Sequence, residues 1–152
     1  MNEPRVEKEL LKLRNSSSQQ LERYGEELAT RRVAWYRSRE AGSSDQGDDI
    51  LEQAYRLLLR KLDLREQEAP ILRKTKTEIV FASKNYCPTL EACKVLGLDT
   101  RTVCRLYNEK ATDVLVKQVD QRLTFSRSYE RIRPYYEYCE ESIQLRGEDE
   151  RA

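Results

Sequence analysis

The sequence predicts an α+β fold in which N-terminal helices pack on a small antiparallel sheet and short helices carry the cysteines. Apolar residues recur mostly every three or four positions as far as Leu62, which is the period of a helix. From Ile71 onwards, β-branched residues and two-residue alternation become more frequent, as in strands. Two short stretches with helix start and stop signals, between Cys87 and Arg105, separate the early strand from the late ones.

The chain of 152 residues is long enough for one domain that buries about two-thirds of its unfolded surface. We expect a flexible leader over residues 1–16, because the run Asn15–Ser18 interrupts a short amphipathic helix. A single α+β domain should occupy residues 17–146, and the charged residues 147–152 should form a disordered tail.

Two helices are expected in the first half of the domain. One runs from Gln19 to Glu40 with Trp35 on its buried stripe, and Gly25 is a tolerated weakness within it. The next begins after Asp49, a good N-cap, and has a broad apolar face that ends at Leu62. Between them, residues 41–48 lack an apolar residue large enough to anchor them and should form a mobile loop.

The second half is predicted to alternate between strands and short helices. Residues 71–83 read as one strand that leads into Cys87. Pro88 begins a helix that Gly97 ends, and Asp99 caps a second one. Three later elements follow: a short helix at 112–119, a strand at 123–129, and residues 135–145, which fit both periods and are predicted as a strand paired with the previous one.

The composition excludes several classes of function. The 28 basic residues nearly cancel the 27 acidic ones, and a net charge of +1 gives no general reason to expect a nucleic acid or an anionic membrane as partner. No apolar run reaches the length of a membrane span, so we expect a cytoplasmic protein with reduced thiols. The absence of histidine removes histidine-based catalytic pairs and histidine-ligated zinc.

The four cysteines are the most informative residues of the chain. Their spacing contains no Cys-x-x-Cys pair, so the pattern does not indicate a zinc ribbon or a ferredoxin. Four thiolates could still hold zinc or an iron-sulfur cluster. Alternatively, some are small core residues, because free cysteine is often buried. The candidate metal ligands are Cys87, Cys93, Cys104 and Cys139.

Cys87 is the strongest candidate for a nucleophile or a ligand. It precedes Pro88 at a predicted helix N-terminus, where the helix dipole and free amides can lower the pKa of a thiol. The alternative is that Cys87 only fills space before the proline.

A second group of candidates lies near the C-terminus. Arg127 and Arg133 are six residues apart around the turn before Cys139, so both could clamp the carboxylate of a small ligand. Surface ion pairs are the alternative for both arginines. Tyr129 is one of several nearby tyrosines, which pack more often than they react, although one could donate a hydrogen bond to a ligand.

The segment from Glu78 to Leu145 resembles the family of L-2-amino-thiazoline-4-carboxylic acid hydrolase-like proteins. The similar motifs are Cys87-Pro88, Leu96-Gly97-Leu98, Cys104, Leu123-Thr-Phe125 with Arg127 and Arg133, and Cys139. The chain departs from the family at Pro134-Tyr135, where Gly-Asp is common, and in having one late cysteine. The resemblance implies an α+β fold and a pocket for a small molecule more directly than it implies thiazoline hydrolysis.

Three hypotheses on function follow. The first is a small-molecule-binding protein or a hydrolase that opens a C–N or C–S bond. In it Cys87 or Cys104 is the nucleophile or a metal ligand, and Glu91 or Glu140 moves protons. The residues expected to bind a carboxylated substrate are Arg127, Arg133, Tyr129 and Cys139.

The second hypothesis is a DNA-binding module, because residues 89–107 resemble a helix-turn-helix. Near-neutral charge and the carboxylates of Glu91 and Asp99 argue against it. The third is a metal or iron-sulfur sensor that uses all four cysteines. A homodimer with Trp35 at its seam is an alternative to a core position for that residue.

Overall fold

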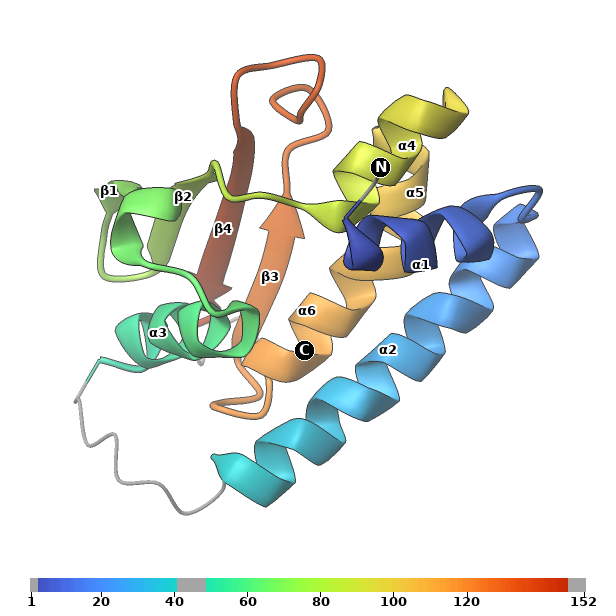
Figure 1. Cartoon of the computed structure of the whole chain (residues 1–152). Coiled ribbons are helices and arrows are strands. Elements are labelled where there is room, and N and C mark those ends of the chain that lie inside the picture. Colours follow the sequence, from blue (N-terminus) through green and yellow to red (C-terminus); the bar gives the residue numbers. More distant parts are fainter. Residues whose placement is uncertain (1–2, 41–48, 148–152) are drawn as a thin grey trace.

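The computed structural model describes residues 3–40 and 49–147, and it has an α+β fold in which helices pack against one antiparallel sheet of strand order β1-β2-β4-β3 (Figure 1). This confirms the predicted fold class. The expected loop at 41–48 and most of the expected tail lie outside the described residues. The elements are α1 (Pro4–Leu13), α2 (Ser18–Arg39), α3 (Ile50–Leu62), the 3₁₀ turn η1 (Glu66–Glu68), β1 (Ile71–Lys74), β2 (Glu78–Ser83), α4 (Pro88–Leu96), α5 (Thr100–Cys104), the π-helical η2 (Arg105–Glu109), α6 (Lys110–Val116), β3 (Leu123–Arg127) and β4 (Cys139–Leu145).

The first helix is part of the domain, which corrects the expectation of a flexible leader over residues 1–16. Glu3 caps α1 by accepting a hydrogen bond from the backbone N of Arg5, and Pro4 occupies its first turn. Val6, Leu10 and Leu13 are buried, and α1 packs on α4. The apolar stripe of this short helix therefore contributes to a core, which holds the helix in the domain.

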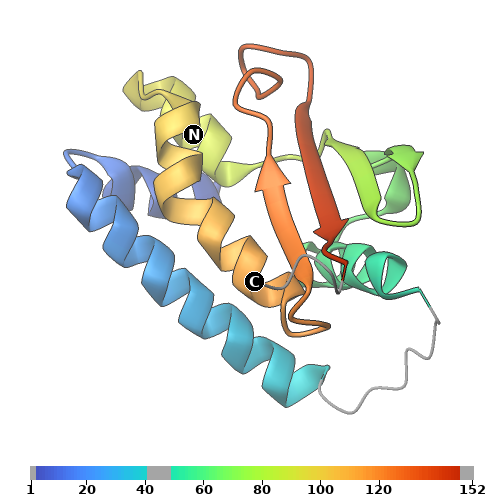
Figure 2. The ribbon, with the colours of Figure 1, turned by 180° about the vertical axis from the view of Figure 1, so that it is seen from behind.

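The long helix α2 buries a stripe that differs from the predicted one. Its buried residues are Leu21, Gly25, Ala29 and Arg32, whereas Trp35 is half-buried, with the ammonium of Lys61 over its ring. The small residues let α2 lie close along the helix formed by η2 and α6, as both views show (Figure 2). A dimer seam at Trp35 stays a prediction.

Gly25 is required by this close approach and is not merely tolerated. A Cβ atom at this position would lie 2.6 Å from the carbonyl oxygen of Leu106, a distance that a side chain does not reach without moving a backbone. Glycine destabilises a helix by about 1 kcal/mol relative to alanine. At this position that cost allows the two helix backbones to be in contact.

The predicted strand at 71–83 is two strands. β1 and β2 form an antiparallel hairpin in which Ile71 pairs with Phe81 and Lys74 with Ile79, because Thr75–Thr77 turn the chain. The prediction of a strand within residues 135–145 is confirmed for 139–145, since β4 pairs with both β2 and β3. Residues 135–138 form the turns that precede it.

Residues 100–116 form one continuous helix, which corrects the prediction of separate helices at Cys104 and at 112–119. Asp99 caps its start, as expected, by accepting a hydrogen bond from the backbone N of Arg101. Gly97, at φ 68°, ends the preceding helix α4. The middle of the long helix is the π segment η2, and such wider turns are frequent at functional sites.

Two clusters of buried apolar side chains stabilise the domain. The main core joins α3 and α6 to one face of the sheet, which we call the inner face, and the second core joins α1, α2, α4 and α5. The sheet contributes Ile79, Phe81, Leu123, Phe125 and Ile143 to the main core.

None of the described helices has the length and apolar character that crossing a membrane requires.

Candidate functional site

A cavity of about 230 Å³ lies at the end of the inner face where β2 and β3 finish and β4 begins. Because side chains alternate along a strand, the inner-face positions continue from the apolar core residues to four polar ones. These are Ser83, Arg127, Cys139 and Glu141, and all four line the cavity. Its other walls come from α2, α3, α4 and the long helix of residues 100–116.

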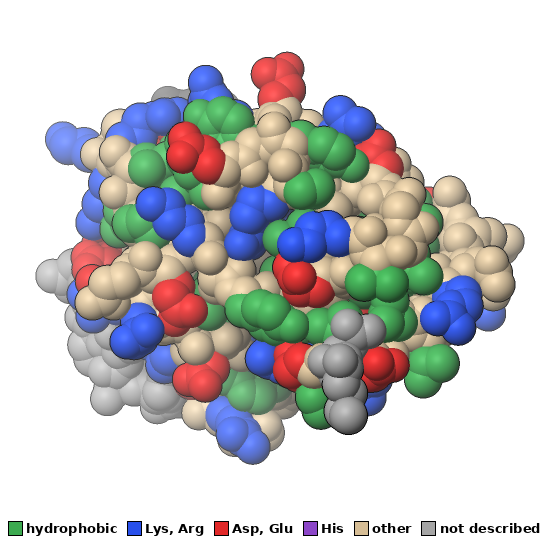
Figure 3. Space-filling model, turned by 45° about the horizontal axis from the view of Figure 1, so that its top comes forward, with side chains coloured by type: hydrophobic (Ala, Val, Ile, Leu, Met, Phe, Trp, Pro, Cys, Tyr) green, Lys and Arg blue, Asp and Glu red, His purple; other side chains and the backbone are tan. Residues whose placement is uncertain are grey.

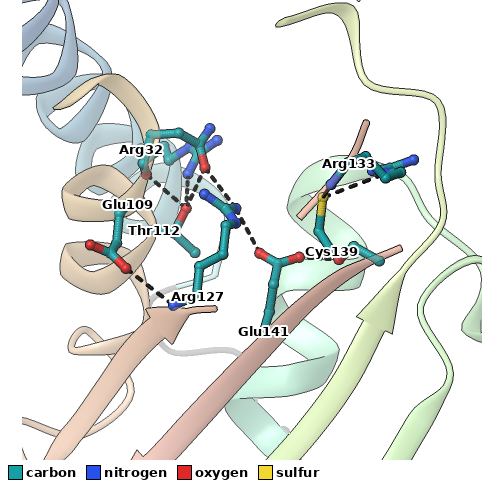
Figure 4. Close-up of polar contacts among 9 residues, drawn as sticks. Arg32, Glu109, Thr112, Arg127, Arg133, Cys139 and Glu141 are labelled. Atoms are coloured by element: carbon teal, nitrogen blue, oxygen red, sulfur yellow. Dashed lines mark hydrogen bonds and ion pairs between the residues drawn. The ribbon is translucent and has the colours of Figure 1, made fainter. Parts of the chain in front are cut away.

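Arg127 is the central residue of the cavity. Its Nη2 donates to Oε2 of Glu141 at 2.7 Å and to Oδ1 of Asn108 at 3.2 Å, as Figure 4 shows. Its side chain is only 9% exposed, yet among the described residues its Nε and Nη1 have no hydrogen-bond partner. Burial alone would lower the pKa of Arg127, but the Glu141 carboxylate raises it above its usual range.

Arg32 is a second buried arginine, and no motif in the sequence indicated that it belonged to the site. It reaches the cavity from α2, where its Nη1 donates to Oγ1 of Thr112 at 2.7 Å. Its Nε is buried and has no partner among the described residues. Burial, and after it the neighbouring Arg127 charge, lowers the pKa of Arg32 to about 10, so it remains a cation at neutral pH.

Glu141 is the acidic residue of the cavity lining. It is 7% exposed and accepts hydrogen bonds from Ser83 Oγ and from Arg127. This one buried carboxylate pairs with Arg127 and acts on the second buried guanidinium group, that of Arg32, only through its charge. Because a buried charge without compensation is costly, this arrangement favours an anion beside Arg32 and Arg127.

Arg133 and Cys139 form a separate pair in the cavity wall. The backbone N and the Nε of Arg133 approach Sγ of Cys139 at 3.4 Å and 3.3 Å. Nη1 of Arg133 donates to the carbonyl oxygen of Asn85 at 2.7 Å. Arg127 and Arg133 both line the cavity, but Arg133 already binds groups of the chain itself, and a carboxylate clamp formed by the two arginines stays a prediction.

The structure brings three of the four cysteines, Cys87, Cys104 and Cys139, to the cavity. The prediction of a lowered pKa at Cys87 is wrong. Cys87 does occupy the N-cap of α4, but burial raises the pKa of its thiol despite a backbone hydrogen bond and the charge of Arg133. Burial also raises the pKa of Cys104 to about 12.

The four cysteines do not form a metal site. Cys93 is fully buried in the second core, where burial raises the pKa of its thiol to about 12. Within residues 3–40 and 49–147, no three Cys, Asp or Glu side chains come together as metal ligands. The hypothesis of a zinc or iron-sulfur site made by all four cysteines finds no support in this arrangement, since a tetrahedral site needs its thiolates around one point.

Three other predicted residues do not line the cavity. Glu91 pairs with Lys94 on α4 at 3.1 Å, and Glu140 pairs with Arg131 at 3.2 Å. Tyr129 packs beneath the guanidinium of Arg105, 4.4 Å from its ring centroid. Neither the proton-transfer roles given to the two glutamates nor contact of Tyr129 with a ligand is consistent with these positions.

One signal in the sequence could have located more of the site. Thr100, Cys104, Asn108 and Thr112 recur every fourth residue and all line the cavity. In a regular α-helix a four-residue step drifts by roughly 40°, but the wider π turn at 105–109 reverses part of this drift. The four residues consequently stay on one side of the helix. Because the prediction placed Cys104 and Thr112 on separate helices, it did not show that the four residues share one side.

The helix-turn-helix hypothesis has the expected helices, but two of the basic residues beside them are engaged within the chain. α4 and α5 do meet at a glycine turn. However, Arg101 pairs with Asp99 and Arg105 covers Tyr129. On the face drawn in Figure 3, Lys and Arg side chains lie among Asp and Glu side chains and form no continuous patch. The geometry therefore favours the cavity over this surface.

No family model, no curated protein and no solved structure matches this chain.

Proposed function

We propose that this protein binds a small carboxylated molecule in the cavity, with Arg127 and Arg32 as the anion-binding residues. One observation carries the proposal: both guanidinium groups are buried, and both keep N–H groups that have no partner among the described residues. Buried donors are nearly always satisfied in folded proteins. A carboxylate matches the planar donor geometry of arginine.

The size and the walls of the cavity support a small ligand with an apolar body. Its volume of about 230 Å³ lies just below the range of about 300–1,000 Å³ typical of sites for drug-sized molecules. Besides the charged residues, the cavity lining includes the apolar side chains of Leu58, Leu62 and Phe81. A carboxylate attached to a small ring fits this lining, and it agrees with what the resemblance to the thiazoline-carboxylate hydrolase-like family implies.

Binding is better supported than hydrolysis. The nucleophiles expected for a hydrolase, Cys87 and Cys104, have thiols whose pKa is raised by burial, so thiolate is scarce at neutral pH. The expected proton-transfer residue Glu91 is not part of the cavity lining. We therefore place ligand binding ahead of catalysis.

The proposal is tested by calorimetry and thermal shift on the full chain. The probes are L-2-amino-thiazoline-4-carboxylate and the matched pair of benzoate and benzamide, which differ in charge but hardly in shape. We expect the carboxylates to bind and to raise the melting temperature, because ligand binding stabilises the folded state. Benzamide should do neither.

Matched variants locate the binding. Arg127→Met and Arg32→Met should lose benzoate binding, whereas Arg131→Met, which removes an exposed arginine outside the cavity, should keep it. Equal effects of benzoate and benzamide, or full benzoate binding by Arg127→Met, would contradict the proposal. Circular dichroism of each variant checks that it is folded.

A further inference from the structure

Among the described residues, Cys139 is the cysteine whose sulfur accepts a hydrogen bond from a guanidinium group. Sγ accepts from the backbone N and from Nε of Arg133 at 3.4 Å and 3.3 Å (Figure 4). The bond from Arg133 Nη1 to the carbonyl of Asn85 holds the guanidinium in this position. A thiol attacks electrophiles through its thiolate, and a guanidinium N–H bonded to sulfur stabilises that negative charge.

The other thiols are less suited to reaction. Cys93 is fully buried away from the cavity. Cys87 and Cys104 line the cavity, but burial raises the pKa of both. Cys139 lines the same cavity and is half-buried, as Cys87 and Cys104 are, so a molecule bound there can meet its sulfur.

An anion site lies next to this thiol. Arg127 is paired with Glu141 in the register of β3 and β4, and Cys139 stands two residues before Glu141 on the same strand and face. This step corresponds to roughly 7 Å along the strand. The buried N–H groups of Arg127 that lack partners among the described residues and the sulfur of Cys139 therefore belong to the lining of one cavity.

We propose that Cys139 is the reactive thiol of the cavity and is alkylated by electrophilic carboxylates held at Arg127. In the reaction, Sγ attacks the electrophilic carbon, an S–C bond forms, and the leaving group departs with the electrons of the broken bond. The thiol proton passes to solvent. The inference rests on the proposed carboxylate site and adds a covalent step and its residue.

The test compares 4-(bromomethyl)benzoate with 4-(bromomethyl)benzamide on the intact protein. Their reactive benzylic carbon lies across the ring from the carboxylate or the amide, and bromide leaves. Rates and sites of modification are measured by peptide mass spectrometry, with glutathione as a free thiol that corrects for intrinsic reactivity. We expect Cys139 to be modified first, with the acid-to-amide rate ratio at least about tenfold above that of glutathione, because a cationic site concentrates an anionic reagent.

Three variants separate the roles of the residues. Arg127→Met should reduce the acid-to-amide ratio to that of glutathione without preventing modification by the amide. Arg133→Met should slow both reagents equally, because it removes the guanidinium donor to the sulfur but leaves the anion site. Arg131→Met should change nothing, and excess benzoate should protect Cys139 in the wild type.

The outcomes distinguish this inference from the proposed function. If benzoate binds but another cysteine reacts first, or Cys139 shows no preference for the acid, the inference is wrong and the binding proposal stands. If benzoate neither binds nor protects, both are wrong. If modification of Cys139 is insensitive to Arg133→Met, the guanidinium has no part in its reactivity and the inference fails.

Discussion

The two ends of the sheet's inner face are made of the same three strands but have opposite character. At one end Ile79, Phe125 and Ile143 are at most 3% exposed and pack against α3 and α6. At the other end the equivalent positions carry Arg127 and Glu141, whose charged side chains are each 9% exposed. Apolar residues there would add to the core. A protein that instead encloses two arginines with one carboxylate gives up stability there, at the place where we propose that an anion binds.

The largest expected effect is on the alkylation rates of two cysteines. It tests whether the charged end of the inner face excludes water as well as an apolar core does. Burial raises the pKa of both Cys93, in the second core, and Cys104, in the cavity wall, to about 12. A thiol with a raised pKa stays neutral below that pH, so at pH 8 each should be alkylated by iodoacetamide on the order of a thousandfold more slowly than a free thiol, since each pKa unit changes the thiolate fraction about tenfold. Both rates should rise as the pH approaches 12.

Time-resolved mass spectrometry at pH 8 measures these rates, with the urea-unfolded protein as the control in which all four thiols react at similar speed. A Cys104 rate close to that of the unfolded chain would mean that water enters the cavity freely, and the comparison with the core would not hold.

The next effect concerns the apolar end. Ile143 is fully buried and pairs with Ile79 on β2 and Phe125 on β3. Ile143→Ala should lower the free energy of unfolding by about 2–5 kcal/mol, because it removes buried methyl groups and leaves a space. Urea unfolding measures the loss. Gln144→Ala, at the exposed neighbouring position, should change stability by less than about 0.5 kcal/mol, and equal losses would show that the core is not where we place it.

A smaller effect is expected where α2 crosses η2, next to the cavity. Gly25→Ala gains about 1 kcal/mol of helix propensity, but its Cβ would lie 2.6 Å from the carbonyl of Leu106. We expect the overpacking cost of about 1–3 kcal/mol to exceed this gain. The free energy of unfolding, measured with urea, should therefore fall slightly. Thr30→Ala, exposed on the same helix, is the control that keeps the propensity gain without the contact. A stabilised Gly25→Ala would mean that α2 lies further from η2.

The smallest effect on stability, and the one opposite in sign, is expected at the charged end. Arg32→Met removes a buried cation that lies near Arg127 and keeps most of the side-chain volume. We expect a free energy of unfolding that is unchanged or up to about 2 kcal/mol higher, together with lost benzoate binding. Thermal and urea unfolding measure the first, calorimetry the second. A variant that unfolds more readily would make Arg32 a structural residue.

Local signals explain why much of the fold was predictable. Asp49, Gly97 and Asp99 are caps whose effect depends on neighbouring backbone groups, and the structure contains all three as expected. The errors arose where contacts distant in sequence decide the result. The leader became α1 because α4 covers its apolar stripe, and residues 100–116 became one helix because α2 supports them.

The sequence by itself determined the fold class, most helix boundaries and the cysteines and late arginines worth considering, since these depend on periodicity and on residue chemistry. Only the tertiary structure decided which of them act together. It placed Arg32, from a helix 95 residues before Arg127 in the chain, at the same cavity, and it excluded Glu91, Tyr129 and Cys93 from that cavity. Burial, which reversed the expected pKa of Cys87, is a property of the packed molecule, because desolvation depends on every neighbouring atom and not on the position of a residue in its helix.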